Sequence, residues 1–466
     1  MKRLIALILT CGCVLSLTAC GSKEEGKEEA ATVNAAAEKA DGFVVEKGSN
    51  KSAAGESDTD VYVDFYGVWD EGNARVEWYQ EKAEEFAKQF EEENGVSVKI
   101  EYVSQGGYDG VAEKLTAGAV SGELPVMAQI EETFLQQFYP ICTDLSGYVS
   151  EEVINNYMDG LKVSCYMNDT LYAVPGGRSY AVLYVNNELL EQAGHSKDEV
   201  VTWDDLHTIA KDVAALGGDV EGYGVIWDTD AWLWESPLYS NGGNITNEDG
   251  TIVEFNKDGA GSIYLQLVQE MLNDGSAYSP YGGSVDPYDA AIEKFAKGEL
   301  GMFLASCTSY GSMRVLMEEG GYTTDISVID QPAGKAGNSV VTGGSNYIIC
   351  NKATETQKKV AAAFLEYLST DKNQAEWNSV SGYLATTDSV YESEYFEENK
   401  KDANLVQIAE GIQYAHSRPQ TKHWREMYLY IVEKLEALSM KPNDYECNAL
   451  VEEMAEYCQT IIDNGN

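Results

Sequence analysis

Short β-rich segments alternate with amphipathic helical segments between residues 61 and 130. In chain order, beginning and ending with a strand, they are residues 61–65, 74–93, 96–103, 108–120 and 125–130. Strands separated by helices require crossover connections, so this alternation predicts a largely parallel sheet. Ligands of such sheets bind beyond the carboxyl ends of the strands, which places Tyr108 and Glu131 near an expected cleft.

The later chain continues as a mixture of strands and helices. The expected strands are residues 181–186, 223–227, 300–306 and 325–329. The expected helices are residues 203–216, 257–272, 289–297, 404–414, 424–438 and 445–463, with another near Trp232. About 400 residues exceed one typical hydrophobic core, so we expect two α/β lobes. Residues 171–180, which contain a proline and two glycines, are interpreted as the first connection between them.

Residues 340–389 are expected to return the chain to the first lobe. A glycine pair, Gly343 and Gly344, precedes a short strand, two helices and a Ser-Gly-Tyr-Leu turn at residues 381–384. Glycines let the backbone approach a ligand closely; an ordinary strand–helix unit with a glycine turn is the alternative interpretation. Three crossings would form a hinge. The expected division is residues 60–176 plus 339–390 for lobe 1 and residues 177–338 plus 391–466 for lobe 2.

Seven stretches of this sequence resemble segments of one protein family. They are GELPVMAQIEE at 122–132, RSYAVLYVNNELLEQAG at 178–194, TWDDLHTIAKDV at 202–213, LASCT at 304–308, GGS at 343–345, SGYL at 381–384 and SRPQTKHWREM at 417–427. They resemble bacterial extracellular solute-binding proteins (family 1) of ABC importers, in particular the glycerol-3-phosphate- and sugar-binding branch. The resemblance implies a periplasmic-binding-protein-like α/β fold, with two α/β lobes, a hinge and an interlobe cleft. Ala181 and Ala385 stand where that branch often has proline.

The resemblance also implies a set of ligand contacts. By residue match these are Tyr108, Glu131, Ser179, Gly344, Tyr383 and Arg418, with a tryptophan pair placed at Trp232 and Trp234. Arg418 can bind a phosphate through two parallel N–H bonds, although in an acidic protein it could instead form a salt bridge. Arg178 could add a second cation. The tyrosines could supply hydroxyl groups, or each could be a core or rim aromatic. The tryptophan pair could form an apolar wall for a glycerol or sugar face.

The N-terminus has the pattern of a bacterial lipoprotein signal. Lys2 and Arg3 precede an apolar run over residues 4–17 that is too short to span a membrane, and Cys20 follows Leu-Thr-Ala. This resembles a lipobox, which implies a signal peptide over residues 1–19 and lipidation of Cys20. A plain signal peptide with a chance cysteine is the alternative. Residues 20–59, rich in Lys, Glu, Ala, Gly and Ser, are expected to form a disordered tether.

Charge and cysteine content restrict the classes of partner. The formal net charge is −45, which argues against nucleic-acid binding because that needs basic surface. The same charge opposes an anionic ligand, so a phosphate would need arginines close by. Of nine cysteines, six lie outside the signal region, and their spacing suggests no metal site. Cys447 and Cys458 could meet near the C-terminus.

These observations predict the lipid-anchored substrate-binding component of an ABC importer. It would sit at the extracellular face of the cytoplasmic membrane, capture glycerol-3-phosphate, a related phosphate ester or a sugar, and deliver it to permease subunits. We expect a monomer without cofactor, metal or catalytic residues, because the four histidines have no metalloenzyme spacing and no Gly-x-Ser-x-Gly motif occurs. The many carboxylates leave a glycosidase pair open. A secreted glycoside hydrolase and a surface lipoprotein without a transport role are the alternatives.

Overall fold

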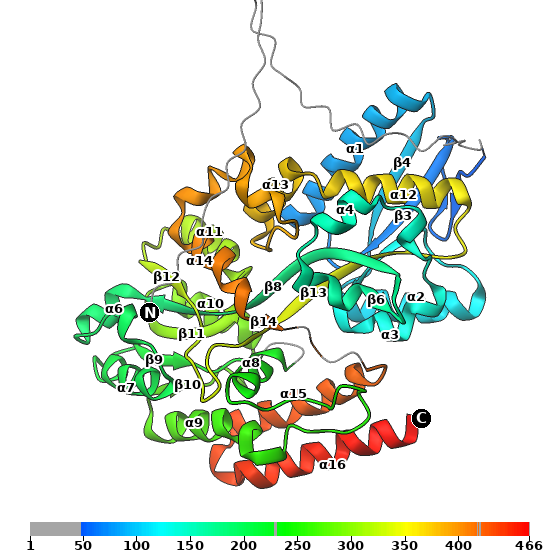
Figure 1. Cartoon of the computed structure of the whole chain (residues 1–466). Coiled ribbons are helices and arrows are strands. Elements are labelled where there is room, and N and C mark those ends of the chain that lie inside the picture. Colours follow the sequence, from blue (N-terminus) through cyan, green and yellow to red (C-terminus); the bar gives the residue numbers. More distant parts are fainter. Residues whose placement is uncertain (1–47, 228–230, 417, 419–420, 466) are drawn as a thin grey trace, which may run out of the picture. The chain divides into compact units, whose positions relative to one another are not determined.

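Two long antiparallel strands, β8 (Ala173–Asn186) and β13 (Val340–Ile349), form the middle of the main sheet. The computed structural model describes residues 48–227, 231–416, 418 and 421–465 (Figure 1). The strand order is β10-β9-β11-β8-β13-β5-β3-β4, with β12 beside β8 and β14 beside β13. We call β13, β5, β3 and β4 the first half of this sheet and β8, β11, β9 and β10 its second half. The sheet is continuous, because β13 and β8 are hydrogen-bonded to each other.

The remaining strands of this sheet are short or of moderate length. They are β3 (Val61–Gly67), β4 (Val98–Ser104), β5 (Met127–Glu131), β9 (Glu221–Gly224), β10 (Ala277–Tyr278), β11 (Leu300–Ser306), β12 (Ile326–Ile329) and β14 (Ala415–His416). The strands β3, β4 and β5 are parallel to one another, as are β9, β10 and β11. The pairs β5–β13, β13–β8 and β8–β11 are antiparallel. The predicted parallel arrangement of the strands between residues 61 and 130 is thus confirmed, whereas the strands in the middle of the sheet pair antiparallel.

Helices cover both halves of the sheet. The longer ones are α1 (Ala74–Asn94), α2 (Tyr108–Ser121), α7 (Trp203–Ala214), α8 (Trp232–Ser240), α9 (Ala260–Asp274), α10 (Pro287–Ala296), α11 (Ser309–Gly320), α12 (Glu355–Leu368), α13 (Asp371–Ser381), α14 (Ala403–Gly411), α15 (Trp424–Met440) and α16 (Cys447–Gly465). The shorter ones are α3 (Leu135–Phe138), α4 (Glu151–Asn156), α5 (Asp159–Lys162) and α6 (Asn187–Gln192), and a two-stranded ribbon pairs β6 (Tyr166–Met167) with β7 (Thr170–Leu171).

Helical periodicity explains which helices contact which strands. The helices α1, α2 and α12 pack against β4, β5 and β3, whereas α7 and α10 pack against β9 and β11. In α12, for example, the apolar side chains spaced at three and four residues are all buried, and Thr354 begins the helix with a capping box. The mixed α/β fold and most of the predicted helices and strands are therefore confirmed.

Most of residues 171–180, interpreted as the first connection, belong to β8, which begins before the expected strand at residues 181–186 and runs through Pro175 and both following glycines as one buried strand. The register shifts within this stretch, because two residues of β8, Gly176 and Gly177, lie opposite one residue of β13, Ser345. Such a bulge accommodates a proline that cannot donate to the ladder. The proposed lobe boundary at residues 176 and 177 thus falls inside a continuous strand, and the lobe limits themselves stay a prediction.

The expected tether also needs a correction at its C-terminal end. The predicted tether covers residues 20–59, but β1 (Lys51–Ser52) and β2 (Gly55–Glu56) form a hairpin within that range. The Ala54 N–H donates to the buried Asp64 carboxylate at 3.0 Å, which holds the hairpin on β3. Cys20 and the signal peptide lie outside the described residues. Within the described part of the chain, none of the helices combines the length and apolar character that crossing a membrane requires.

The suggested pairing of Cys447 with Cys458 is wrong. Both lie on α16, eleven residues apart in sequence. A rise of 1.5 Å per residue separates them by about 16 Å along the helix, whereas the α-carbons of a disulfide lie no more than about 7 Å apart.

Candidate functional site

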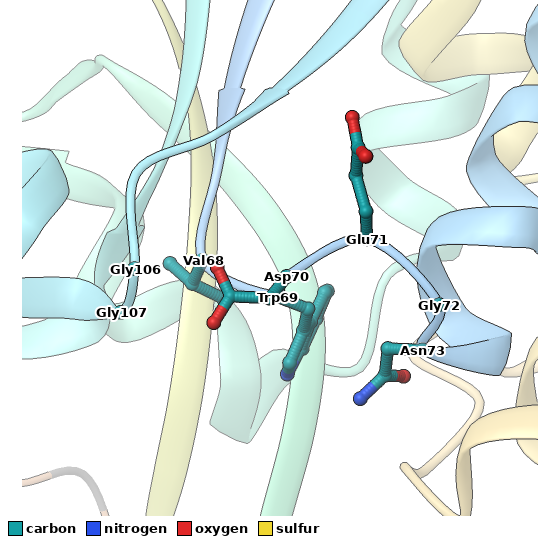
Figure 2. Close-up of a pocket in the computed structure, with 8 residues that line it drawn as sticks. All are labelled: Val68, Trp69, Asp70, Glu71, Gly72, Asn73, Gly106 and Gly107. Atoms are coloured by element: carbon teal, nitrogen blue, oxygen red, sulfur yellow. The ribbon is translucent and has the colours of Figure 1, made fainter.

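The carboxyl ends of β3 and β4 border a surface depression of about 470 Å³. Figure 2 shows the segment from Val68 to Asn73 on one side and Gly106–Gly107 on the other. Asn73 caps α1 by accepting a hydrogen bond from the Arg75 N–H at 3.0 Å, and Gly107 begins α2 with a φ of 115°. Such left-handed backbone favours glycine. The loops are therefore positioned by the starts of two helices.

Aromatic rings extend from this depression toward the sheet junction. The ring of Trp69 lies 5.8 Å from that of Tyr383, which stacks on Trp377 with ring centroids 5.7 Å apart and an interplanar angle of 7°. A side chain at Gly177 would meet both Tyr383 and Trp377 at 3.3 Å. Glycine in β8 therefore lets the predicted residue Tyr383 lie directly against the strand, where the Leu384 N–H donates to the Arg178 carbonyl at 2.8 Å.

Arg75 is a site residue that the sequence analysis missed. Its guanidinium carbon lies 5.6 Å from the centroid of Trp69 and 5.3 Å from that of Tyr383, within range of cation–π interaction. Its Nη2 donates to the Ser381 carbonyl at 2.9 Å, and its buried Nε has no hydrogen-bond partner among the described residues. Only the folded arrangement of α1 against α13 brings these groups together, so no local sequence pattern could have identified Arg75.

Tyr108, the first residue of α2, brings a buried hydroxyl group to the site. This hydroxyl lies near Tyr383, Glu131 and Ser345 without meeting hydrogen-bond geometry within the described part of the chain. Burial, followed by the nearby Tyr383 and Glu131, raises the pKa of Tyr108 well above its ordinary value. The phenol is therefore neutral at physiological pH and able to donate to a ligand.

Glu131 and Arg418 join the two halves of the sheet. Glu131 ends β5, where its carboxylate accepts the Thr133 N–H at 2.8 Å, and it also accepts from the Arg418 Nη1 at 3.4 Å. Arg418 binds Glu235 of α8 through its Nε at 3.3 Å and its Nη2 at 2.5 Å. The Arg418 guanidinium also lies 5.3 Å from the Trp424 ring. All three charged side chains are buried, so Arg418 is held between two carboxylates in a nearly dry environment.

Glu235 was not predicted, although the sequence contains a signal for it. It follows Trp232 by three residues, and residues at this spacing share one face of a helix. Trp232 lies against the glycine pair, because a side chain at Gly343 would meet its ring at 3.5 Å and the Ser179 hydroxyl at 3.9 Å. Trp232 and Ser179 therefore both lie close to Gly343, with Trp232 on the same face of α8 as Glu235.

Gly344 has a structural reason to be glycine. Its φ is 113°, and a side chain there would approach the Gly177 carbonyl oxygen to 2.0 Å. It pairs with Arg178 in the β8–β13 ladder. Gly344 thus permits the close crossing of these strands beside the site.

Trp234 does not belong to the site and is a correction to the predicted pair. Its Nε1 donates to the Gly261 carbonyl at 2.9 Å and its ring packs edge-on against Phe255, inside the core of the second half. Residues two positions apart on a helix point about 200° apart, so Trp232 and Trp234 cannot face the same ligand.

Arg178 is likewise occupied by a separate buried network. It pairs with Glu132 and donates to the Ser164 hydroxyl at 2.6 Å and the Asn346 side-chain oxygen at 2.5 Å. Glu132 also accepts from the Thr342 hydroxyl at 3.0 Å. These bonds satisfy a buried charge beneath the β8–β13 crossing, so Arg178 supports the site instead of supplying a second cation.

The assembled groups are suited to holding a polar molecule. Carboxylates accept hydrogen bonds from hydroxyl groups, the phenol of Tyr108 donates, and the faces of Trp69, Tyr383 and Trp232 offer apolar surface. Among the described residues, no group of three or more His, Cys, Asp or Glu side chains is arranged to hold a metal ion.

Known proteins are similar to this chain in sequence and in fold. Residues 85–404 match the family described as bacterial extracellular solute-binding protein. The sn-glycerol-3-phosphate-binding periplasmic protein UgpB of Pectobacterium atrosepticum is 26% identical over 329 residues, covering 66% of this chain and 70% of that protein. The GacH receptor of Streptomyces glaucescens, solved unliganded and with acarbose, has a TM-score of 0.73 at 20% identity, covering 86% of this chain and 98% of that chain.

A further similar structure is UgpB from Mycobacterium tuberculosis in complex with glycerophosphocholine. Its TM-score is 0.71 at 18% identity, and the match covers 86% of this chain and 98% of that chain. These structures confirm the predicted periplasmic-binding-protein-like α/β fold, and the family match extends over more than half of the sequence. The chain belongs to the family of bacterial extracellular solute-binding proteins.

Proposed function

We propose that the chain is the lipid-anchored substrate-binding component of an ABC importer, and that it binds a neutral, polyhydroxylated solute of the sugar class without changing it chemically. The observation that carries this proposal is the state of Arg418. Its guanidinium is already bound by Glu235 and Glu131, so two buried acidic side chains face one cation. A neutral solute can bond to these groups without facing the repulsion that an anion would experience.

The surrounding groups support the same class of solute. A sugar presents hydroxyl groups at its edge and C–H groups on its face, and the site offers carboxylate acceptors beside aromatic faces. The depression at Trp69 has the volume of an ordinary small-ligand pocket. The nearby Asp70 and Asn73 side chains add polar groups at its rim.

A phosphate ester is the second candidate. The curated relative from Pectobacterium atrosepticum is named for sn-glycerol-3-phosphate, and Arg418 matches the position that the sequence resemblance assigns to the phosphate. For a phosphate to bind there, Arg418 would have to exchange at least one of its carboxylate partners for the ligand.

Titration calorimetry with the purified chain separates the two candidates. Neutral mono- to tetrasaccharides, sn-glycerol 3-phosphate and glycerophosphocholine are tested in parallel. We expect heat of binding with a neutral sugar, and a roughly tenfold loss of affinity in Tyr108→Phe, because one hydrogen bond is lost. Arg314→Ala, which removes a mostly exposed arginine, is the control. Binding of a phosphate ester that Arg418→Ala abolishes would instead establish the second candidate.

The absence of chemistry on the sugar is checked on the same samples. The chain is incubated with the bound sugar, and the products are analysed by mass spectrometry. We expect the mass of the sugar to be unchanged. Release of a reducing end would establish the alternative of a glycoside hydrolase. A screen in which none of these solutes binds or raises the melting temperature would favour a surface lipoprotein without a transport role.

The anchor and the delivery step form the second part of the proposal. Cys20 is proposed as the lipidated residue, which would keep the binding protein beside the permease at the extracellular face of the membrane. Metabolic labelling with a fatty acid should mark the full chain and should fail in Cys20→Ser. Uptake of the bound solute should fall in cells that lack the chain. If cells released the protein unlipidated and fully active into the medium, the proposed lipid anchor would be wrong.

A further inference from the structure

Cys142 and Cys350 lie opposite each other in the first half of the sheet. Cys142 follows the short turn Tyr139–Ile141, Cys350 follows β13, and the two residues form an isolated antiparallel bridge. The flanking bonds are clear: the Asn351 N–H donates to the Ile141 carbonyl at 2.8 Å, and the Thr143 N–H donates to the Ile349 carbonyl at 2.7 Å. The two cysteines are thus held in register by bonds on both sides.

This pattern defines the spacing of the pair. The hydrogen bonds flank the two cysteines instead of joining them, which is the non-hydrogen-bonded type of antiparallel pair, with α-carbons about 4.5 Å apart. Disulfides occur at α-carbon separations of about 4.4–6.8 Å. Directly opposite side chains also project to the same face of a sheet. The backbone therefore already has the separation and orientation that a disulfide needs.

Neighbours, not burial, distinguish this pair, because all six cysteines of the described residues are buried. Cys142 is 5% exposed and Cys350 is 0% exposed. The other thiols have different neighbours: Cys165 donates to the Asn346 side chain, Cys307 to the Gly382 carbonyl and Cys447 to the Gln269 side chain. All six cysteines of the described part are unpaired thiols in this structure.

We propose that Cys142 and Cys350 form a disulfide in the mature extracellular protein. Members of this family work outside the cytoplasm, where conditions favour disulfides. The oxidant is a small disulfide such as oxidised glutathione. One cysteine thiolate attacks it, forming a mixed disulfide and releasing one glutathione thiolate; the second cysteine thiolate then displaces the other glutathione. The two protein sulfurs lose two electrons, and the two protons from their thiols pass to the released glutathiones.

The bond is expected to form while the chain folds. Burial raises the pKa of the Cys142 thiol well above its ordinary value, and burial together with Cys142 does the same for Cys350. Because the thiolate is the reactive form, the folded reduced protein should be slow to oxidise. A disulfide here would join segments roughly 200 residues apart in the chain and should raise the melting temperature by about 5 °C.

The full chain is refolded with oxidised and reduced glutathione, denatured, alkylated with N-ethylmaleimide, then reduced and labelled with a second reagent. Peptide mass spectrometry should find Cys142 and Cys350 carrying only the second label. The first label should mark all the other cysteines of the full chain, namely Cys11, Cys13, Cys20, Cys165, Cys307, Cys447 and Cys458. First label on Cys142 or Cys350, or a bond from either to another cysteine, would overturn the proposal.

Variants give an independent readout. The difference in melting temperature between the oxidised and reduced chain should disappear in Cys142→Ser and in Cys350→Ser. It should persist in Cys165→Ser, which removes a buried thiol of the same half. If neither variant of the pair folds, the labelling of the unchanged chain decides the matter alone.

Discussion

Glu235 and Arg418 form an ion pair in which neither side chain has solvent exposure. Losing one partner leaves a buried charge short of its counter-charge, at a cost of about 3–5 kcal/mol. Glu131 stays beside the cation in the variant and should limit the effect. We therefore expect Glu235→Gln to lower the free energy of unfolding by about 3 kcal/mol, measured by urea denaturation of the ligand-free chain.

The matched control is an exposed pair of the same type. Lys401 and Glu398 are 69% and 79% exposed, and Glu398→Gln should change the free energy of unfolding by less than about 1 kcal/mol. Equal losses in the two variants would contradict the view that Arg418 depends on its buried carboxylates. It would also weaken the argument that these carboxylates make the site unfavourable to anions.

His195 gives the clearest residue-scale dependence on pH. Its two ring nitrogens lie 2.8 Å from Asp212 and 2.9 Å from Glu199, and these hydrogen bonds raise the pKa of His195 above its ordinary value. A raised pKa contributes stability that is fully present below the unfolded-state pKa of about 6.5 and is lost as pH rises through the folded-state pKa. The melting temperature of His195→Gln should fall further below that of the unchanged chain at pH 5.5 than at pH 8.5. An equal difference at both pH values would contradict this assignment.

The elements at the junction depend on backbone geometry. Gly344 has a φ of 113°, and a Cβ added there would lie 2.0 Å from the Gly177 carbonyl oxygen. Gly344→Ala must therefore force β8 and β13 apart. We expect this variant to lower the free energy of unfolding by more than about 2 kcal/mol and to lose ligand binding, because β13 also aligns Trp232 with the site. Thermal melts and calorimetry check both effects.

A second glycine in a regular element provides the control. Gly311 lies inside α11 with ordinary helical backbone and nothing within 4 Å of an added side chain. Gly311→Ala should leave stability unchanged or raise it by up to about 1 kcal/mol. If Gly344→Ala behaved like Gly311→Ala, the close crossing of β8 and β13 would not be the reason for glycine.

Elements with strong periodicity were predictable from the sequence, whereas the junction was not. The α12 helix shows its apolar spacing and its cap in the residues themselves. The continuity of β8 through Pro175 depends on pairing with β13, far along the chain, around a bulge at Gly176 and Gly177, and this pairing overrides the local turn signal. The candidate site could be predicted only in part, for the same reason. Arg418 could be placed by resemblance, but its partner Glu235 and the stacked Arg75 are set by tertiary packing.

At the scale of the whole molecule, charge separates the two candidate ligands. The chain has 77 acidic and 32 basic residues, and its net charge of −45 creates a negative potential around any approaching solute. Salt shortens the reach of that potential from about 30 Å at 0.01 M to about 8 Å at 0.15 M. The buried contacts of Arg418 with its carboxylates are screened far less.

These facts predict that the affinities for the two candidate ligands respond differently to salt. The affinity for a neutral sugar should stay constant within about twofold between 0.01 and 0.15 M sodium chloride, because no net charge is transferred. The affinity for sn-glycerol 3-phosphate should rise over the same range, because the long-range repulsion is screened while local contacts persist. Calorimetry at three salt concentrations measures both, and repeating it with potassium chloride excludes a specific effect of sodium. A phosphate ester whose affinity falls with added salt would show that locally exposed cations dominate the site, contrary to the buried pairing of Arg418.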